Sequence, residues 1–258
     1  MSDLVILKLG GSVITEKKTR FSFRADVMSR ISREIARCWP TPLVIIHGGG
    51  SYGHPIASEY NISRGFKEQR QLEGFVKTIQ AMRELNHLVT DTMINVGIGA
   101  VGMPASLIFV TNNGAIQTAH LDLIFSSLEL GVIPVTCGDA VFDRTRRFTI
   151  LSGDSIAVYL AKALKARRLV FAVDVDGVYE YDRETGERRL LETLDYRHHA
   201  TLLYRDVGDV TGGMFEKVET AFEAHRAGIE VAMVNGLVDG RVESAVKGEK
   251  VDGTRLVG

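Results

Sequence analysis

The stretch LVIIHGGGSYGHP, residues 43–55, joins an apolar run to a glycine-rich loop. Its apolar residues follow one another without alternation, which is typical of a parallel strand covered on both faces. Gly48, Gly50 and Gly53 match the dinucleotide pattern G-x-G-x-x-G, and residues 48–53 also frame the P-loop pattern G-x-x-x-x-G-K-[ST]. A strand that ends in such a loop predicts an α/β fold with a ligand at the carboxyl end of the strand.

Both nucleotide patterns fail on closer inspection. A dinucleotide fold needs a second strand with an acidic residue ~20 positions later, but residues 70–97 have the periodicity of a long amphipathic helix. His54 and Pro55 stand where a P-loop has its Lys and hydroxyl. The loop can still bind an anion, because glycine amides and a helix N-terminus converge on negative charge. We expect Pro55 in the first helical turn and His54 as a donor, although a plain turn with a surface histidine explains this loop alone equally well.

Strands and helices alternate along the chain. This order predicts the α/β class, as a three-layer αβα sandwich around a mainly parallel open sheet. Residues 138–150 have the pattern of a β-hairpin with a polar tip. We expect a single domain, 1–258, whose two lobes divide near residue 150. The expected strands are 4–9, 43–47, 106–110, 132–136, 168–175 and 229–236, and the expected helices are 22–38, 70–97, 121–130, 153–166 and 213–227.

Composition narrows the class of protein. Of 258 residues, 45% are hydrophobic and 24% charged, with a net charge of -1, as in ordinary globular enzymes. Neither nucleic acid nor an anionic membrane is expected as a partner. No apolar stretch reaches the ~18 residues of a membrane span, so we expect a cytoplasmic protein. Cys38 and Cys137 are expected to be reduced and buried.

Four further glycine loops accompany the first one. They are KLGGS (8–12), LSGDS (151–155), DVDGVY (174–179) and DVTGGMFEK (209–217), and most follow a strand or open a helix. Each is weak evidence alone, since glycine after a strand is more often a turn. Together they gather several anion-binding loops and three or more lysines at one sheet edge. That combination predicts a site for more than one phosphate group, and therefore phosphoryl transfer.

The motifs KLGGSVITEK, HGGGSYGH, SGDSIA, DVDGVY and DVTGGMFEK, in this order, resemble the amino-acid kinase superfamily. Within it the sequence is similar to the isopentenyl phosphate kinases of the archaeal type, for which His54 is the narrower marker. The resemblance implies an ATP-dependent conversion of isopentenyl phosphate into isopentenyl diphosphate, a step of isoprenoid biosynthesis by the alternative mevalonate route. It also implies an acceptor-binding lobe over about 1–150, a nucleotide-binding lobe over about 151–258, Mg²⁺ carried by the nucleotide with no metal ligands in the protein, and a homodimer.

The resemblance also assigns roles to residues. The catalytic set is Lys8, Lys17, His54, Asp154 and Lys217, in which Asp154 orients Lys8 and Lys217. Whether Lys17 or Lys18 faces the site stays open. The acceptor phosphate is expected at Gly49, Gly50, Gly53, His54 and Gly153. The ATP side is expected at Lys8, Gly10, Gly11, Ser12, Gly50, Asp174, Asp176, Gly177, Val178, Tyr179, Gly212, Gly213 and Lys217.

An apolar tail on the acceptor needs a pocket. Phe75, Ile79 and Met82 lie on one face of the helix expected over 70–97. Periodicity alone favours core packing for these residues. The family holds its acceptor tail near this helix, so they form the expected tail pocket, with Met82 as the residue that selects chain length.

Two other functions remain open at this point. A fosfomycin kinase, or a kinase of another small phosphate or phosphonate, has similar motifs. A nucleotide-binding regulatory or storage module without turnover has the same fold, although the joint presence of the four charged catalytic residues Lys8, Lys17, Asp154 and Lys217 argues against it. His198 and His199 lack the partners of a metal site, and we expect them in a solvated loop.

Overall fold

The computed structural model describes residues 3–181, 185, 187–205 and 212–258. Their main feature is an eight-stranded sheet in the order β12-β14-β13-β9-β1-β2-β6-β3. Neighbouring strands are parallel throughout, except for the antiparallel pair β13–β14. In chain order the strands are β1 (Val5–Leu9), β2 (Leu43–His47), β3 (Ala100–Gly102), β6 (Ile133–Cys137), β9 (Arg168–Val173), β12 (Thr193–Asp195), β13 (Glu230–Asn235) and β14 (Gly253–Val257).

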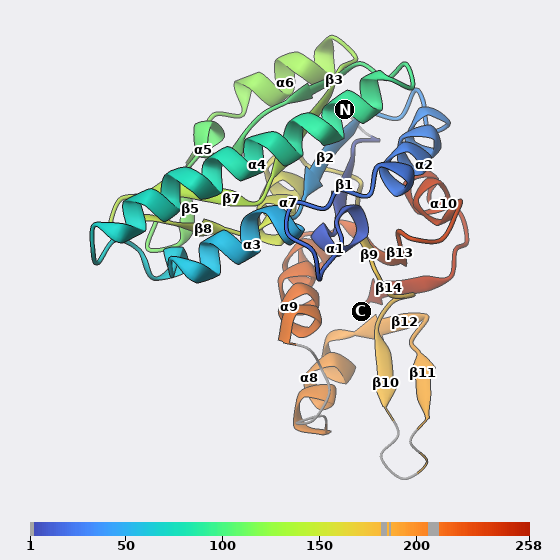
Figure 1. The fold of residues 1–258 in the computed structure, drawn as a ribbon. Helices are drawn as coiled ribbons and strands as arrows, with labels where there is room; N and C mark the ends of the chain where they lie inside the picture. Colours follow the sequence, from blue (N-terminus) through green and yellow to red (C-terminus); the bar gives the residue numbers. More distant parts are fainter. Residues whose placement is uncertain (1–2, 182–184, 186, 206–211) are drawn as a thin grey trace.

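Helices cover both faces of this sheet (Figure 1). Alternate residues of β1 enter different cores: Ile6 packs with the helices of one face, and Leu7 with those of the other. The first face carries α5 (Ala105–Ile108), α6 (Asp122–Glu129), α7 (Gly153–Ala163) and α9 (Gly212–Arg226); the second carries α2 (Ala25–Ala36), α3 (Gly50–Glu59), α4 (Arg70–Ile94) and α10 (Arg241–Lys247). The predicted three-layer α/β sandwich is confirmed. No described helix is long and apolar enough to cross a membrane.

The order of the strands reverses at β1. On one side of β1 the sheet continues with β2, β6 and β3, and the later strands β9 and β13 lie on its other side. Leu9 is in register with His47 on one side and with Ala172 on the other. The carboxyl ends of these three strands therefore lie together, and such a switch point is where open α/β sheets bind ligands.

Two smaller sheets extend from the body. One, in the order β5-β4-β7-β8, contains β4 (Phe109–Asn112), β5 (Ala115–Ala119), β7 (Asp139–Asp143) and β8 (Arg147–Leu151), and its β7–β8 pair is the hairpin expected over 138–150. The other is the hairpin of β10 (Tyr179–Tyr181) and β11 (Arg188–Leu190), which projects below the body in Figure 1. The strand expected over 106–110 is wrong in part: α5 ends at Ile108 and β4 follows it. Short apolar runs do not distinguish a buried helix from a buried strand.

The expected solvated loop around His199 is also wrong. Residues Tyr196–Arg205 form α8, and His199 is only 2% exposed. Its ring stacks on Phe215 of α9 at a centroid distance of 4.4 Å, and its Nε2 lies 3.3 Å from a carboxylate oxygen of Glu219. An exposed pair of histidines and a packed helical histidine look the same in sequence, because the partners come from a distant helix. The remaining short helices are α1 (Gly11–Ile14) and η1 (Ile62–Arg64).

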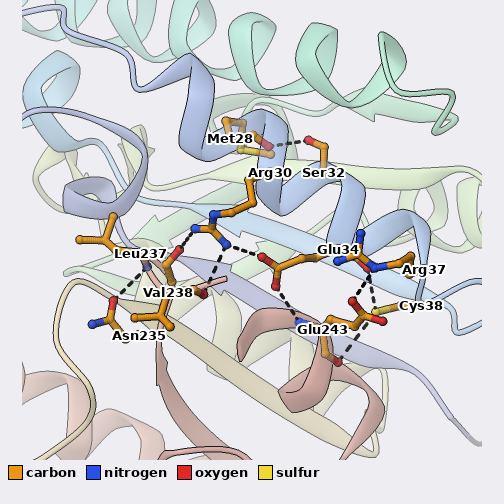
Figure 2. Close-up of polar contacts among 11 residues, drawn as sticks. Met28, Arg30, Ser32, Glu34, Arg37, Cys38, Asn235, Leu237, Val238 and Glu243 are labelled. Atoms are coloured by element: carbon orange, nitrogen blue, oxygen red, sulfur yellow. Dashed lines mark hydrogen bonds and ion pairs between the residues drawn. The ribbon is translucent and has the colours of Figure 1, made fainter. Parts of the chain in front are cut away.

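A buried ion pair fastens α2 to the segment that follows β13. Figure 2 shows Arg30 paired with Glu34. Arg30 also donates to the carbonyl of Gly236. Glu34 is fully buried and accepts the backbone N–H of Glu243 at 3.1 Å, at the start of α10. Because a buried carboxylate is stable only with its donors in place, this network fixes the loop between β13 and α10 at the carboxyl edge of the sheet.

Candidate active site

A cavity of about 1060 Å³ opens at the carboxyl edge of the sheet, where the glycine loops meet. It is walled by the segments that follow β1, β2, β6, β8 and β9, and by the first turns of α9. Most of the residues expected from the sequence line it. They are Lys8, Gly10, Gly11, Ser12, Lys17, Gly49, Gly50, Gly53, His54, Met82, Gly153, Asp154, Asp174, Gly177, Val178, Tyr179, Gly213 and Lys217.

Three expected residues, Phe75, Ile79 and Asp176, are not among the described residues that line this cavity. Phe75 and Ile79 belong to a separate apolar cluster, in which Phe75 stacks on Phe148 at 4.8 Å between ring centroids. Phe75 is two helical turns, about 10 Å, from Met82, so the same face of α4 reaches the cavity at Met82 and the β7–β8 hairpin at Phe75. Asp176 lies behind the wall, and Gly212 is the first residue of α9. The motif residues 209–211 lie outside the described part of the chain.

The loop after β2 and the loop after β1 pack backbone against backbone. The N–H of Gly48 donates to the carbonyl of Leu9 at 2.9 Å. A Cβ on Gly11 would lie 2.4 Å from the amide nitrogen of Gly50, and Gly50 itself has φ +47. No side chain fits at either position, since Cβ contacts are never so short and this φ strains L-residues. The glycines are therefore needed to bring two anion-binding loops into contact.

Helix α3 begins earlier than the sequence suggests. It starts at Gly50, so Pro55 lies inside the helix and not in its first turn, as had been expected. Proline cannot donate to the carbonyl of Ser51, and that carbonyl instead accepts the N–H of Phe21 at 3.3 Å. The N–H of Ser51 donates to the hydroxyl of Thr15 at 3.0 Å. These contacts hold the glycines of the loop at the positive end of the helix.

His54 lies on the cavity side of α3 and is exposed to the cavity. Its pKa is lowered by desolvation and by the charge of Lys8, and to a smaller extent by Lys217, while Asp154 opposes the shift. The imidazole is therefore neutral near pH 7 and offers one N–H to an anion. A neutral donor beside a glycine loop is suited to hold a phosphate group.

Asp154 lies between two lysines that are far apart in sequence. Its carboxylate oxygens are 2.8 Å from Nζ of Lys8 and 2.5 Å from Nζ of Lys217. Burial would raise the pKa of Asp154, but the two lysines hold it below its usual value. Burial, together with Lys8, lowers the pKa of Lys217 to about 8, although Asp154 opposes this shift. One fixed carboxylate thus keeps two ammonium groups side by side on the cavity wall.

Lys17 is the lysine that reaches the site. Its Nζ lies 2.6 Å from Oδ2 of Asp174, and both residues line the cavity. Lys17 is 68% exposed, and Lys18 is not among the lining residues. Burial would raise the pKa of Asp174, but hydrogen bonds from Lys17 and Ser12 hold it below its usual value. This pair is open to solvent and can rearrange when a charged ligand enters.

The carboxylate of Asp176 connects the DVDGVY segment to the loop between β13 and α10. This carboxylate accepts hydrogen bonds from Tyr179 at 2.8 Å and from Asn235 at 3.1 Å, and it forms an ion pair with Arg241 at 2.5 Å. These partners lie at the start of β10, at the end of β13 and at the start of α10. Asp176 therefore positions the DVDGVY segment and does not form part of the wall.

Some residues of the site were not foreseen. Asp139 lines the cavity, is 2% exposed, and has its pKa raised to about 7 by burial. A local signal for this position exists, because Gly138 follows a predicted strand like the glycines of the other loops. Thr15, which supports the start of α3, and His47 and Asn86, which lie under the glycine loop, have no such signal. Their contacts arise between separate elements.

The geometry is that of a phosphoryl-transfer site, and comparison with known proteins places the chain in a family. Residues 3–235 match the family described as "Amino acid kinase family". This match covers most of the chain, so the protein belongs to the amino acid kinase family.

Within that family the chain is similar to isopentenyl phosphate kinases. It is 37% identical to the isopentenyl phosphate kinase of Methanothermobacter thermautotrophicus, with 99% of each chain covered. A solved isopentenyl phosphate kinase structure superposes with a TM-score of 0.85, 35% identity and coverage of 98% and 99%. The product complex of the Thermoplasma acidophilum isopentenyl phosphate kinase superposes with a TM-score of 0.80 at 27% identity, over 98% of this chain and 100% of that one.

Proposed function

We propose that this protein transfers the γ-phosphoryl group of ATP to isopentenyl phosphate, which yields isopentenyl diphosphate and ADP. The nearly full-length similarity to isopentenyl phosphate kinases supports this assignment. One observation carries it: the cavity holds a glycine loop with His54 beside a pair of lysines fixed by Asp154. The glycine loop with His54 suits the attacking phosphate, and the lysine pair suits the phosphoryl group that is transferred.

The acceptor needs no strong general base. A phosphate monoester is already anionic near pH 7, so one of its oxygens can attack the γ-phosphorus directly. The P–O bond to the bridging oxygen of ADP breaks as the new P–O–P bond forms, and ADP leaves with that electron pair. Gly49, Gly50 and Gly53 with His54 hold the attacking phosphate, and Gly153 flanks it. The work of the site is alignment and charge neutralisation.

Bringing two polyanions together is the main obstacle. At 4 Å, each pair of like unit charges costs about 4 kcal/mol at an effective dielectric constant of 20. Lys8 and Lys217 contact the transferring group, and Lys17 contacts the β/γ region of ATP. Asp154 keeps the first two lysines in place before substrates arrive, so little reorganisation is required during transfer.

Mg²⁺ enters with ATP as part of the substrate. Among the described residues, no cluster of three or more His, Cys, Asp or Glu side chains could hold a metal ion. The cavity carboxylates of Asp154 and Asp174 are paired with lysines. We propose that Mg²⁺ is carried by the nucleotide phosphates, as the family resemblance implies, where it would neutralise charge.

The two lobes divide the substrates between them. Loops of the first lobe, about residues 1–150, receive the acceptor, and loops of the second, about 151–258, receive the nucleotide. Met82 lies on the wall beside Gly53 and limits the length of the acceptor tail. Two other features stay predictions: a homodimer, from the family resemblance, and a cytoplasmic location, from the sequence.

The decisive experiment is an acceptor screen. ADP release is followed in a coupled assay with ATP and, in parallel, isopentenyl phosphate, dimethylallyl phosphate, geranyl phosphate, fosfomycin and no acceptor. We expect the highest kcat/KM for isopentenyl phosphate and only background release without acceptor. A higher kcat/KM for fosfomycin would identify a fosfomycin kinase. ATP binding without ADP release for any acceptor would identify a non-catalytic nucleotide-binding module.

A further inference from the structure

His47 lies directly beneath the glycine loop that follows β2 and does not line the cavity. It is the last residue of β2 and is fully buried. Its Nδ1 lies 3.0 Å from the carbonyl oxygen of Gly48, and its Nε2 lies 3.1 Å from the side-chain nitrogen of Asn86 on α4. A polar ring at this depth must have both nitrogens satisfied, and the partners define which nitrogen carries the proton.

Asn86 decides the tautomer of His47. Its Nδ2 also lies 3.1 Å from the carbonyl oxygen of Val135. A carbonyl only accepts, so this contact fixes the amide with its NH₂ group toward Val135 and His47. The amide therefore donates one hydrogen to Val135 and the other to Nε2 of His47. Nε2 is an acceptor, and the single proton of the neutral ring is on Nδ1, facing the carbonyl of Gly48.

The imidazole of His47 stays in the neutral Nδ1–H form near neutral pH. Burial lowers the pKa of His47 to about 4, and the nearby charge of Lys8 acts in the same direction, whereas the hydrogen bond to Gly48 opposes it. At neutral pH the imidazole is uncharged, with one donor and one acceptor. The contact to Gly48 is thus a permanent N–H···O=C hydrogen bond.

This hydrogen bond orients the next peptide N–H. The C=O of Gly48 and the N–H of Gly49 belong to one planar trans peptide and point in opposite directions. Holding the carbonyl down toward His47 therefore turns the amide of Gly49 away from the ring. Gly49 lines the cavity, whereas His47 does not. A glycine peptide has little resistance to rotation of its own, so the loop needs an external group to set its direction.

We propose that His47, held in its Nδ1–H tautomer by Asn86, is a positioning residue that aims the Gly49 amide at the acceptor phosphate. This inference rests on the proposed function of the loop. Hydrogen bonds to charged groups contribute roughly 1.5–3 kcal/mol. Loss of the alignment therefore raises the KM for the acceptor by about ten- to a hundredfold, since each tenfold change is 1.4 kcal/mol. The KM for ATP is unaffected, because the nucleotide meets other loops.

The test uses substitutions that remove or restore the hydrogen bond to the carbonyl of Gly48. His47→Leu fills the buried site with an apolar side chain that cannot donate to Gly48. We expect a KM for isopentenyl phosphate at least about tenfold higher, with a KM for ATP within about twofold of the wild type. His47→Asn should restore part of the acceptor affinity, because its amide can donate to Gly48.

Thr90→Val is the matched control. Thr90 is buried one turn along α4, and its hydroxyl bonds only to backbone carbonyls of its own helix. We expect its melting temperature to fall, with both KM values unchanged. Equal increases of both KM values in His47→Leu, or no rescue by His47→Asn relative to His47→Leu, would show a structural role only and overturn the inference.

Nuclear magnetic resonance separates this inference from the proposed function. Imidazole nitrogen shifts should show Nδ1–H for His47 in the wild type. With inorganic phosphate as the probe, the Gly49 amide should shift in the wild type and stay in place in His47→Leu. These readouts need no turnover. Failure of the wild type to use isopentenyl phosphate would reject the proposed function, whereas an Nε2–H tautomer or an unchanged Gly49 amide in the wild type would reject the role of His47.

Discussion

We propose that the two sides of the cavity hold their ligands by different physical means. On the proposed acceptor side, backbone meets backbone: Gly50 touches Gly11 of the loop after β1, and buried His47 lies 3.0 Å from the carbonyl oxygen of Gly48. On the proposed nucleotide side, charged side chains line the wall, as in the exposed pair of Lys17 and Asp174. In this proposal a small phosphate is recognised by amides that are fixed in advance, whereas side chains that can adjust help to hold a larger, highly charged nucleotide. Lys8 and Lys217, which are both paired with Asp154, lie between the two sides.

Removing the charge of Asp154, which lies between the two sides of the cavity, should have the largest effect on activity. In Asp154→Asn, the negative charge that opposes the lowered pKa of Lys217 is gone, and Lys8 and Lys217 repel each other. We expect kcat/KM to fall about a thousandfold at pH 8, the upper range for loss of a preorganised electrostatic group. The alkaline limb of kcat/KM for ATP, which reports the free enzyme, should lie near pH 8 in the wild type and move to lower pH in the variant.

The direction of that shift follows from the proton balance. The active form of Lys217 is protonated, so activity falls as pH rises through its pKa, and a lower pKa brings the fall to a lower pH. Asp174→Asn is the matched control, because it removes a carboxylate from the same cavity but one paired with Lys17. Its alkaline limb should stay where it is in the wild type. Identical limbs in both variants would contradict the assignment of the limb to Lys217.

Removing the imidazole of His54 should have a smaller effect, confined to the acceptor substrate. We expect His54→Ala to lower kcat/KM for isopentenyl phosphate about a hundredfold, because one hydrogen bond to a charged group is lost at the attacking phosphate. The Kd for ATP, measured by calorimetry, should change by less than about threefold. Equal losses for both substrates would place His54 between the two sites and remove its role as an acceptor donor.

The smallest effect is expected for Arg241, whose ion pair with Asp176 lies outside the cavity lining. In Arg241→Met the long apolar stem is kept but the ion pair with Asp176 is lost. This pair is partly exposed, so its contribution is of the order of 1 kcal/mol or less. We expect the KM for ATP to rise about two- to fivefold, with the KM for isopentenyl phosphate unchanged, in steady-state assays at saturating partner substrate. An increase confined to the acceptor would contradict the division of the cavity into two sides.

The sequence alone was sufficient for the fold class and for the placement of the glycine loops at one edge of the sheet. Successive apolar residues in 4–9 and 43–47 indicate strands buried on both faces, and glycines directly after them indicate loops at one edge. These are local properties, set by composition and spacing within a few residues. The hairpin at 138–150 follows in the same way, because its turn and its strands are adjacent in the chain.

Local patterns were insufficient where the deciding partner is distant. Pro55 was expected to start α3, but Gly50 does so because Thr15 and Phe21 bond to the first turn from another loop. Phe75 shares a helical face with Met82, yet only Met82 reaches the cavity, because the β7–β8 hairpin covers the other end of that face.

What the sequence by itself determined is the set of groups available for catalysis: glycine loops, lysines, one aspartate and one histidine in a fixed order. Only the tertiary structure decided how they combine. It placed Lys8 and Lys217 on the same carboxylate of Asp154, chose Lys17 over Lys18, and set Asn86 against His47. The physical reason is that these contacts join residues from separate elements, whose distances are set when parallel strands align their carboxyl ends. No spacing along the chain encodes them.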